Sequence, residues 1–381
     1  MHGSSPRTPR GGVLHVVTDP RRRGAQTFAY DLHRELRSRG VASEIAALAP
    51  DAEASPTTVS TTGVGLSIPT LGRRRLSPDT LVALRGQAGR ARVVVAHGSS
   101  TLPACAAALA FGRTPFVYVN IGDPRHWAAT RLRRLRVGLL LRRAAAVASV
   151  SRVGRDLLIE RYGLSPGRVR AIPNGRRPDA YPRVDTASRA AARKELGVAD
   201  DAIVIAAVGA LSAEKRVDLA IEAFARLRDD RCLLLIAGDG PHRGRLAGLA
   251  AELAPGRVRF LGTVDDAGPV YRAADVLLLT SDSEGVPGVL VEAGLSGIPA
   301  VATDVGFVRD VVLDGTTGAL AARGDAAAVA DGVRRVLADR EAYGEAAHQH
   351  CVATYSMQSV VDAWQDLLDA VAGPVGRTDR A

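Results

Sequence analysis

The segment Ser281–Gly297, which reads SDSEGVPGVLVEAGLSG, decides how this chain folds. It follows an apolar run at 275–280 that predicts a buried strand, and its Gly-Val-Pro-Gly turn leads into the helix-compatible stretch Val289–Ser296. A strand, a glycine-rich turn and a helix start form an anion cradle, because the first N–H groups of a helix lack partners within the helix. Two carboxylates, Glu284 and Glu292, flank the turn with seven residues between them. The pattern favours a ligand with phosphate in the middle and hydroxyl groups at both ends, such as a sugar nucleotide.

Length and composition fit a globular protein with two domains of ordinary size. The chain has 381 residues, of which 46% are hydrophobic and 24% are charged, and this length is enough for two hydrophobic cores. It contains no apolar run of the roughly 20 residues that a membrane-spanning helix needs. The start, MHGSSPRTPR, has basic residues but no apolar segment behind them. We therefore expect a cytoplasmic protein without a signal peptide, and disordered tails at 1–10 and 373–381.

Charge and cysteine content limit the classes of partner. The formal net charge is +10, and Lys194 and Lys215 are the only lysines among many arginines. A basic surface suits phosphates, anionic lipid or nucleic acid, but an aromatic content of 4% and the lack of a recognition motif argue against nucleic acid. The cysteines Cys105, Cys232 and Cys351 lie far apart, which predicts reduced thiols and neither a disulfide framework nor a metal site.

Strand patterns alternate with helix patterns through both halves of the chain. Runs such as Val13–Val17 precede amphipathic stretches such as Ala25–Arg39, and this alternation predicts parallel sheets with right-handed crossovers. This alternation stops at 176–192, where prolines, arginines and small polar residues predominate. The composition of this segment indicates a linker. We expect two doubly wound, Rossmann-like α/β domains facing across a cleft, with ligands at the carboxyl ends of the strands. The expected parts are a first domain at 11–175, the linker at 176–192, a second domain at 193–352, and a C-terminal helix at 353–372 that packs back toward the first domain.

Two loops at the start of the second domain add candidate ligand contacts. Lys215 precedes an amphipathic helix that follows the predicted strand Ile203–Val208, so it could reach a phosphate at the strand ends. A solvated lysine is the alternative, but a cation at a helix start is unfavourable against the helix dipole, and this awkward placement favours a function. The next strand leads into Gly238-Asp-Gly-Pro, where Gly238 and Gly240 predict either a tight turn or a close approach of backbone to a ligand.

Several segments also occur in an order and spacing that is typical of one enzyme family. In the second half these are GALSAEKRVDLAIEAF, LLLIAGDGP, VRFLGTV, SEGVPGVLVEAGLSGIPAVATDVG and DGTTGAL. In the first half, VVTDPRRRGAQTFAYDLHRELRSRG, AHG at 96–98 and ASVSRVGRDLLIERYGLSPGRVRAIPNG match more loosely. Over 13–372 the chain thus resembles the retaining GT-B glycosyltransferases of family 4. The resemblance implies a GT-B fold and transfer of a sugar from a nucleotide-diphosphate donor, a UDP-sugar above all, to an acceptor hydroxyl with retention of anomeric configuration.

The resemblance implies roles for individual residues. Glu284 would contact hydroxyls of the transferred sugar and Glu292 the ribose, while Lys215 would supply charge to the diphosphate. His97 resembles the family histidine that faces the reacting sugar, although a histidine at a strand end is more often structural. No metal or other cofactor is expected, because protein cations would stabilise the leaving diphosphate. The other residues expected at the donor are Gly24, Gly238, Gly240, Gly262, Gly285, Val286, Pro287, Gly288 and Val289.

Two features depart from the family pattern. Ala210 stands where the family usually has an arginine, and the loss of one charge-assisted contact to a diphosphate would cost about 1.5–3 kcal/mol. Arg21, Arg22 and Arg23 stand where the family tends to have paired glycines, of which Gly24 is kept. One hypothesis is that an arginine of this loop contacts the donor diphosphate or an anionic acceptor. A solvated basic loop is the equal alternative.

Other functions share this architecture. A phosphorylase that uses pyridoxal phosphate needs a Schiff-base lysine, which a chain with two lysines disfavours. A nucleotide-sugar epimerase of GT-B architecture stays open. So does a non-catalytic sugar-nucleotide-binding protein, because of Ala210. The sequence does not indicate the acceptor.

One basic segment suggests a second kind of partner. Arg131–Arg143 reads RLRRLRVGLLLRR and predicts an amphipathic helix with Leu132, Leu135 and Leu139 on one face. Such a helix can dock peripherally on anionic lipid at the inner face of a membrane, next to a lipid-linked acceptor. The alternative, which the sequence favours, is that the leucines pack into the core and the arginines are solvated.

Overall fold

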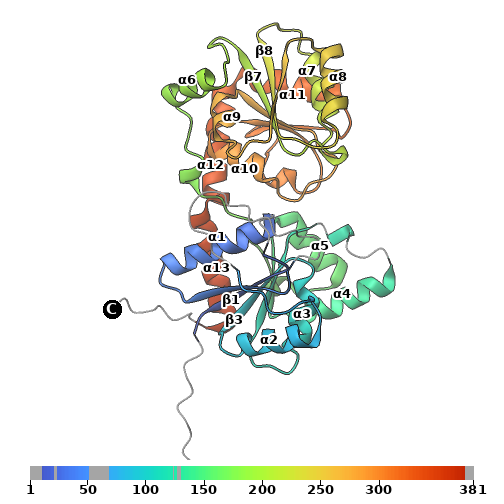
Figure 1. Cartoon of the computed structure of the whole chain (residues 1–381), viewed down its shortest axis with the longest axis vertical. Helices are drawn as coiled ribbons and strands as arrows, with labels where there is room; N and C mark the ends of the chain where they lie inside the picture. The colour runs from blue at the N-terminus through green and yellow to red at the C-terminus, as the bar shows by residue number, and fades with distance from the viewer. Residues whose placement is uncertain (1–10, 21–23, 51–67, 123, 127–129, 374–381) are drawn as a thin grey trace, which may run out of the picture. The chain divides into compact units, whose positions relative to one another are not determined.

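The computed structural model describes residues 11–20, 24–50, 68–122, 124–126 and 130–373, and they form two compact units (Figure 1). The first unit takes Met1–Asn174 together with Val360–Ala381, and the second takes Gly175–Ser359. Each unit is built on a parallel sheet of six strands. This confirms the prediction of two doubly wound α/β domains.

The sheet of the first unit has the strand order β2-β1-β3-β4-β5-β6, so the chain crosses over at β1. All of its neighbouring strands pair in parallel, as in Val94 beside Phe116. Its strands are β1 (Val13–Val17), β2 (Ser43–Ala47), β3 (Val93–His97), β4 (Phe116–Asn120), β5 (Ala146–Ser149) and β6 (Val169–Ala171). Its helices are α1 (Gly24–Ser38), α2 (Pro78–Ala88), α3 (Thr101–Ala108), α4 (Arg131–Arg143), α5 (Arg152–Tyr162) and most of α13 (Met357–Ala372).

Alternate residues of β1 serve the two faces of this sheet, as side chains on a strand must. Leu14 and Val16 belong to a buried cluster that also takes in side chains of α2, α3, α4 and α5. On the other face Val17 packs with residues of α1 and β2. That face is also covered by α13, whose buried Trp364 lies 6.5 Å from the ring of Phe28 in α1.

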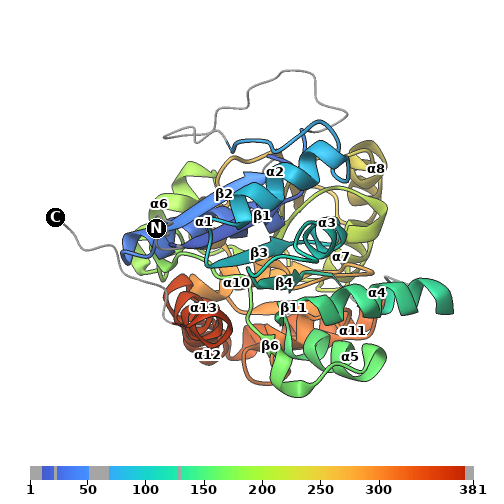
Figure 2. The same ribbon diagram turned by 90° about the horizontal axis from the view of Figure 1, so that it is seen from below.

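The helix α4 is the exception to this burial. It lies at the edge of the first unit, and its N-terminal end extends away from the sheet (Figures 1 and 2). Leu132, Leu135 and Leu139 are 69%, 58% and 55% exposed, whereas Gly138 and Leu141 are buried. The prediction that these leucines pack into the core is therefore wrong, because the buried residues of α4 lie in its C-terminal half. No helix among the described residues is long and apolar enough to span a membrane.

The sheet of the second unit has the order β12-β11-β10-β7-β8-β9. Its first strand, β7, is central, and the chain adds β8 and β9 on one side before it crosses to β10 on the other. The strands are β7 (Ile203–Val208), β8 (Cys232–Ala237), β9 (Val258–Gly262), β10 (Val276–Leu279), β11 (Ala300–Thr303) and β12 (Gly318–Ala321). The helices are α6 (Thr186–Glu195), α7 (Val217–Ala225), α8 (Arg243–Leu253), α9 (Gly268–Ala273), α10 (Gly288–Leu295), α11 (Ala326–Ala338) and α12 (Arg340–Tyr355).

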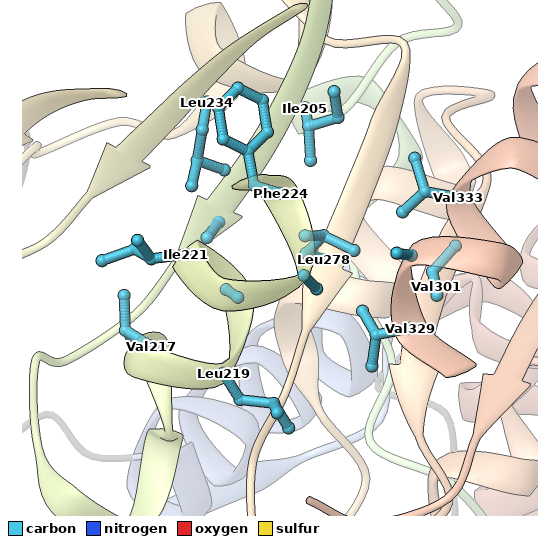
Figure 3. Close-up of a cluster of buried hydrophobic side chains, with 14 of the residues drawn as sticks. Ile205, Val217, Leu219, Ile221, Phe224, Leu234, Leu278, Val301, Val329 and Val333 are labelled. Atoms are coloured by element: carbon cyan, nitrogen blue, oxygen red, sulfur yellow. The ribbon is translucent and has the colours of Figure 1, made fainter. Parts of the chain in front are cut away.

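One face of this sheet packs on α7 and α11 through aliphatic side chains (Figure 3). Phe224 and Ile221 of α7 and Val333 of α11 are at most 1% exposed, and they meet Ile205 and Leu278 of the strands. The opposite face is covered by α9 and α10, with Val291 and Tyr271 among the buried residues. The strand ends that carry the predicted site are thus held by cores on both sides.

The segment 176–192, which we expected to be a linker, lies within the second unit and is partly helical. Asp185 caps α6 by a capping box with Ser188, whose N–H donates to the Asp185 carboxylate over 2.7 Å. This helix then packs on the unit through Arg189 and Arg193. The expected linker thus includes Arg189, which, like Arg193 just after it, binds a buried carboxylate.

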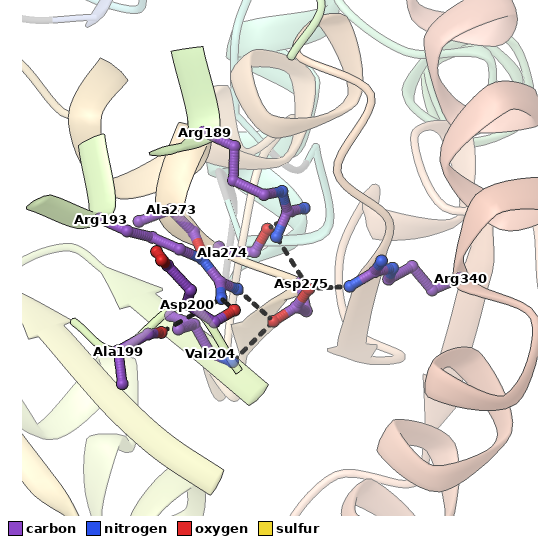
Figure 4. Close-up of polar contacts among 9 residues, drawn as sticks. All are labelled: Arg189, Arg193, Ala199, Asp200, Val204, Ala273, Ala274, Asp275 and Arg340. Carbon is purple, nitrogen blue, oxygen red and sulfur yellow. Dashed lines mark hydrogen bonds and ion pairs between the residues drawn. The ribbon is translucent and has the colours of Figure 1, made fainter. Parts of the chain in front are cut away.

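That carboxylate is Asp275, which immediately precedes β10 and is 1% exposed (Figure 4). Its Oδ1 accepts from Arg189 at 2.9 Å and from Arg340 of α12, and its Oδ2 accepts from Arg193 at 3.0 Å. The backbone N–H of Val204 in β7 also donates to Oδ2, over 2.7 Å. A single carboxylate therefore joins α6, α12 and β7 at the amino end of β10.

Candidate functional site

The predicted ligand residues of the second unit gather where β7 and β10 end. These two strands are neighbours, and the connections from them lead to opposite sides of the sheet. Ligands of open α/β sheets bind in the crevice at such a switch point, outside the carboxyl ends of the strands. The loop after β7 carries Ala210 and Lys215, and the loop after β10 carries Glu284 and leads into α10.

Lys215 and Glu284 are in direct contact across this switch point. The Lys215 ammonium donates to Oε1 of Glu284 over 2.7 Å, and the hydroxyl of Ser281 donates to the same oxygen over 2.6 Å. The Glu284 side chain is 9% exposed, whereas that of Lys215 is 30% exposed. The loop that carries Lys215 is fixed to the end of β10, since the hydroxyl of Thr280 donates to the carbonyl of Arg216 over 2.8 Å. A fixed cation therefore stands beside a nearly buried carboxylate.

The start of α10 lies directly after Glu284. Pro287 is the N-cap of this helix and makes no side-chain cap hydrogen bond, which leaves the first N–H groups without that partner. Gly306 packs so closely on the backbone of Glu284 that a Cβ atom there would collide with the Glu284 carbonyl oxygen. Gly306 thus packs on the backbone of Glu284, and Gly285, Val286 and Pro287 connect Glu284 to the start of α10.

Glu292 lies one turn further along α10 than Gly288. Its Oε1 accepts from Nε of Arg176 and its Oε2 from the hydroxyl of Tyr271, both over 2.9 Å. Arg176 was not among the predicted site residues, because it lies in the stretch that we expected to be a linker. No local sequence signal could have found it, since 116 residues separate it from its carboxylate partner.

Three of the glycines expected at the donor, Gly238, Gly240 and Gly262, lie where β8 and β9 end. The N–H of Gly238 donates to the carbonyl of Gly262 over 2.7 Å, and a Cβ atom at Gly238 would collide with the carbonyl oxygen of Gly209. At Gly240 a Cβ atom would come within 2.7 Å of the Leu211 carbonyl oxygen. At Gly238 and Gly240 the backbone approaches too closely for a Cβ atom, and this requires glycine, whereas Gly262 has a positive φ of 74°. Ala210, beside them, is exposed.

His97 lies in the first unit, at the end of β3, and its side chain is 1% exposed. Its Nε2 is 3.0 Å from Nδ1 of His15, and its ring is 6.4 Å from that of Trp364. Burial lowers the pKa of His97 to about 3, and burial, followed by the repulsion that a protonated His15 would meet from protonated His97 and His33, lowers the pKa of His15. The structure thus places a neutral histidine pair under α1 and α13, and the sugar-facing role of His97 stays a prediction.

This pair predicts a loss of stability in acid. In the unfolded chain both histidines titrate near 6.5, whereas in the folded first unit they stay neutral until the pH is much lower. The unfolded state then binds more protons, so the free energy of unfolding should fall as the pH drops from about 6.5 toward 3. Urea titrations followed by tryptophan fluorescence would measure it, since Trp364 is buried in this unit. A midpoint that does not change between pH 7 and pH 5 would contradict the neutral pair, and His97→Asn should reduce the pH dependence.

Other predicted residues are placed as follows. Arg21, Arg22 and Arg23 lie outside the described residues, and Gly24 is the first residue of α1. Cys105, Cys232 and Cys351 are free and buried, and burial raises the pKa of each thiol. No group of three or more His, Cys, Asp or Glu side chains in the described parts of the chain could hold a metal ion.

Comparison with family models gives a match in each half of the chain. Residues 22–180 match the model described as Glycosyltransferase Family 4, and residues 188–350 match Glycosyl transferases group 1. Among curated proteins, the D-inositol 3-phosphate glycosyltransferase of Geodermatophilus obscurus is 37% identical over 54% of this chain and 48% of its own. That of Nocardia farcinica is 35% identical over 68% and 58%, respectively. The chain thus spans about half the length of the curated relatives it matches.

Solved structures show the same fold over almost the whole chain. HepE of Anabaena, in complex with UDP, has a TM-score of 0.81 at 21% identity and covers 94% of this chain and 100% of its own. Sucrose-phosphate synthase of Thermosynechococcus elongatus has a TM-score of 0.75 at 20% identity, with 95% and 99% covered. The chain therefore belongs to the family 4 glycosyltransferases (glycosyl transferases group 1), and its two parallel six-stranded units are those of the GT-B fold.

Proposed function

We propose that the protein transfers a sugar from a nucleoside-diphosphate donor, with UDP-sugars as the first class, to an acceptor hydroxyl with retention of anomeric configuration. The observation that carries the proposal is the contact between Lys215 and Glu284 at the β7–β10 switch point. The uncapped start of α10 lies next to it, and Glu292 follows on the same helix. In such a donor, the cation and the helix start match the diphosphate. Glu284 matches the transferred sugar, and Glu292 matches the ribose.

In the proposed sugar transfer, the main task of the protein is to stabilise the leaving diphosphate. The bond from the anomeric carbon to the phosphate oxygen breaks, the acceptor oxygen bonds to that carbon on the same face, and the acceptor proton leaves with the diphosphate. Lys215 and the N–H groups of α10 would stabilise the negative charge by electrostatics that are already in place. Glu284 would accept hydrogen bonds from the transferred sugar, which fixes its anomeric carbon relative to Lys215.

One experiment separates this function from its rivals. The protein is incubated with UDP-sugars, and with ADP- and GDP-sugars, and free nucleotide, epimerised donor and bound donor are measured. Transfer releases nucleotide in proportion to the acceptor, whereas an epimerase changes the sugar and a binding protein only retains the donor. D-inositol 3-phosphate is the first acceptor to test, because several relatives are named for it. Retention is read from the anomeric signal of the product. Absence of nucleotide release with every donor would refute transfer.

A second proposal concerns α4: its leucine face docks on an anionic bilayer, which places the protein peripherally at the inner face of a membrane. The argument is charge and exposure together. Three leucines at 132, 135 and 139 are more than half exposed, and α4 holds arginines but no acidic residue. Apolar side chains ringed by cations fit the boundary between head groups and acyl chains. Unpaired buried cysteines accord with the cytoplasmic side.

Replacing Leu132, Leu135 and Leu139 together by serine should lower binding to vesicles that contain phosphatidylglycerol by at least about tenfold. The changes are exposed, so the fold and the release of nucleotide in solution should stay as in the wild type. Sedimentation with phosphatidylglycerol vesicles and with neutral phosphatidylcholine vesicles measures the effect, and Leu313→Ser, another exposed leucine at 40%, is the control. The docking would be refuted if the wild-type protein did not sediment with anionic vesicles. It would also be refuted if the three leucines were found to hold a dimer together in solution.

A further inference from the structure

Arg176 is built into the second unit at both its backbone and its side chain. Its N–H donates to the carbonyl of Tyr355 over 2.8 Å, and its carbonyl accepts from Met357 over 2.7 Å. Its side chain then passes over the start of α10, where a Cβ atom at Gly288 would collide with the guanidinium. It is 25% exposed and ends on Glu292. The glycine at 288 thus makes room for this arginine.

Tyr271 approaches the same carboxylate from the opposite side. Its ring is fully buried in α9 and meets Tyr181 edge to face, with centroids 6.2 Å apart. Its hydroxyl donates to Oε2 of Glu292 over 2.9 Å. Burial, together with the negative charge of Glu292, raises the pKa of Tyr271. The phenol therefore stays protonated and can only be held as a donor to Glu292.

These two contacts use only some of the hydrogen-bond acceptor positions of the Glu292 carboxylate. A carboxylate has about four lone-pair positions, two on each oxygen. Arg176 takes one position on Oε1 and Tyr271 takes one on Oε2, while the Glu292 side chain keeps 15% of its surface exposed. One acceptor position then remains on each of the two oxygens. Two adjacent hydroxyl groups, such as the 2′ and 3′ hydroxyls of a ribose, fit this pair.

We infer that Arg176 and Tyr271 are positioning residues that hold Glu292 for both ribose hydroxyls of the donor, and that they make the site select ribonucleotides over 2′-deoxyribonucleotides. The inference rests on the proposed function, which supplies a nucleotide at this site. Selection arises because a deoxyribose leaves one fixed acceptor position of a partly buried carboxylate without a donor, and an unpaired polar group is costly. Without Arg176 or Tyr271 the Glu292 carboxylate could rotate. The acceptor position that the deoxyribose leaves unpaired could then turn toward water, and the selection would be lost.

The test compares the dissociation constants of UDP and 2′-deoxy-UDP for the wild type, Arg176→Gln and Tyr271→Phe. We expect the wild type to prefer UDP by about tenfold or more, which is about 1.4 kcal/mol. In each variant the affinity for UDP should fall while that for 2′-deoxy-UDP changes little, so the ratio should approach one. Arg177→Gln is the matched control, since Arg177 is the next residue and its guanidinium binds Asp179 rather than Glu292, and it should keep the wild-type ratio.

The outcomes separate the inference from the function on which it rests. If the wild type binds UDP but does not prefer it over 2′-deoxy-UDP, or if both variants keep the preference, the positioning role is wrong and the proposed function stands. If the wild type binds neither UDP, ADP nor GDP, both fall. Arg176→Lys keeps the charge but not the planar guanidinium, so it remains informative if Arg176→Gln unfolds. Its ratio should lie between those of the wild type and Tyr271→Phe, and an unchanged ratio in both would overturn the inference.

Discussion

Replacing Lys215 with methionine is expected to lower the rate of sugar transfer by about 100- to 1000-fold. The ammonium lies 2.7 Å from Oε1 of Glu284, four residues before α10 begins, and a methionine fills similar space without charge. Negative charge would then develop on the leaving diphosphate with the helix N–H groups as its main partners in this unit. Nucleotide release from the donor that supports turnover is the measurement, with the Michaelis constant and the turnover number determined separately.

The chain offers its own control for this change. Lys194 is the only other lysine, and it lies exposed on α6, so Lys194→Met should leave the rate within about a factor of two. Glu284→Gln should also lose most of the transfer, because it weakens both the lysine contact and the acceptance of sugar hydroxyls. If Lys215→Met keeps more than a tenth of the wild-type rate, the lysine does not serve the leaving group.

The largest effect on stability is expected from Asp275→Ala, which should lower the free energy of unfolding of the second unit by about 3–5 kcal/mol. Three arginines and one backbone N–H share this carboxylate, which is 1% exposed. Its removal would leave Arg193, itself 4% exposed, without its carboxylate. A cation that is buried without its counterion is far more costly than the pair. Urea unfolding followed by circular dichroism measures the change.

An exposed pair of the same type serves as the comparison. Asp331 is 74% exposed and forms an ion pair with Arg334 one turn further along α11. Asp331→Ala should change the free energy of unfolding by less than about 0.5 kcal/mol, because water screens exposed pairs. Equal effects of the two substitutions would mean that the arginine cluster around Asp275 does not stabilise the unit.

The parts of the fold that could be predicted are those with a strong local pattern. The central strands β7 and β10 carry uninterrupted apolar runs, and both were expected where they are found. The strands β2 and β12 were missed, and both lie at an edge of their sheet. Their sequences, SEIAA and GALA, show little β-branched content, so pairing with a neighbouring strand rather than intrinsic preference makes them strands.

The candidate site divides in the same way. Lys215 and Glu284 could be brought together from the sequence, because parallel strands place the loops that follow them at one edge of a sheet. The pairing of Arg176 with Glu292 could not be predicted, because it depends on how the segment 176–192 packs on the second unit. The exposure of Leu132 could not be predicted either, because an amphipathic pattern marks an apolar face and does not say what covers it.

The ends of the second unit meet in space. Arg176, its second residue, bridges Ser356, which lies three residues before its end, and the two run in parallel. The first unit, by contrast, is built from two separate stretches of chain. The second unit is therefore an insertion with neighbouring ends, and we expect that a gene fragment for 175–359 can be exchanged between relatives as one piece. Such an exchange carries Arg176 along with Glu292, whereas a cut placed after a supposed linker at 192 would separate them.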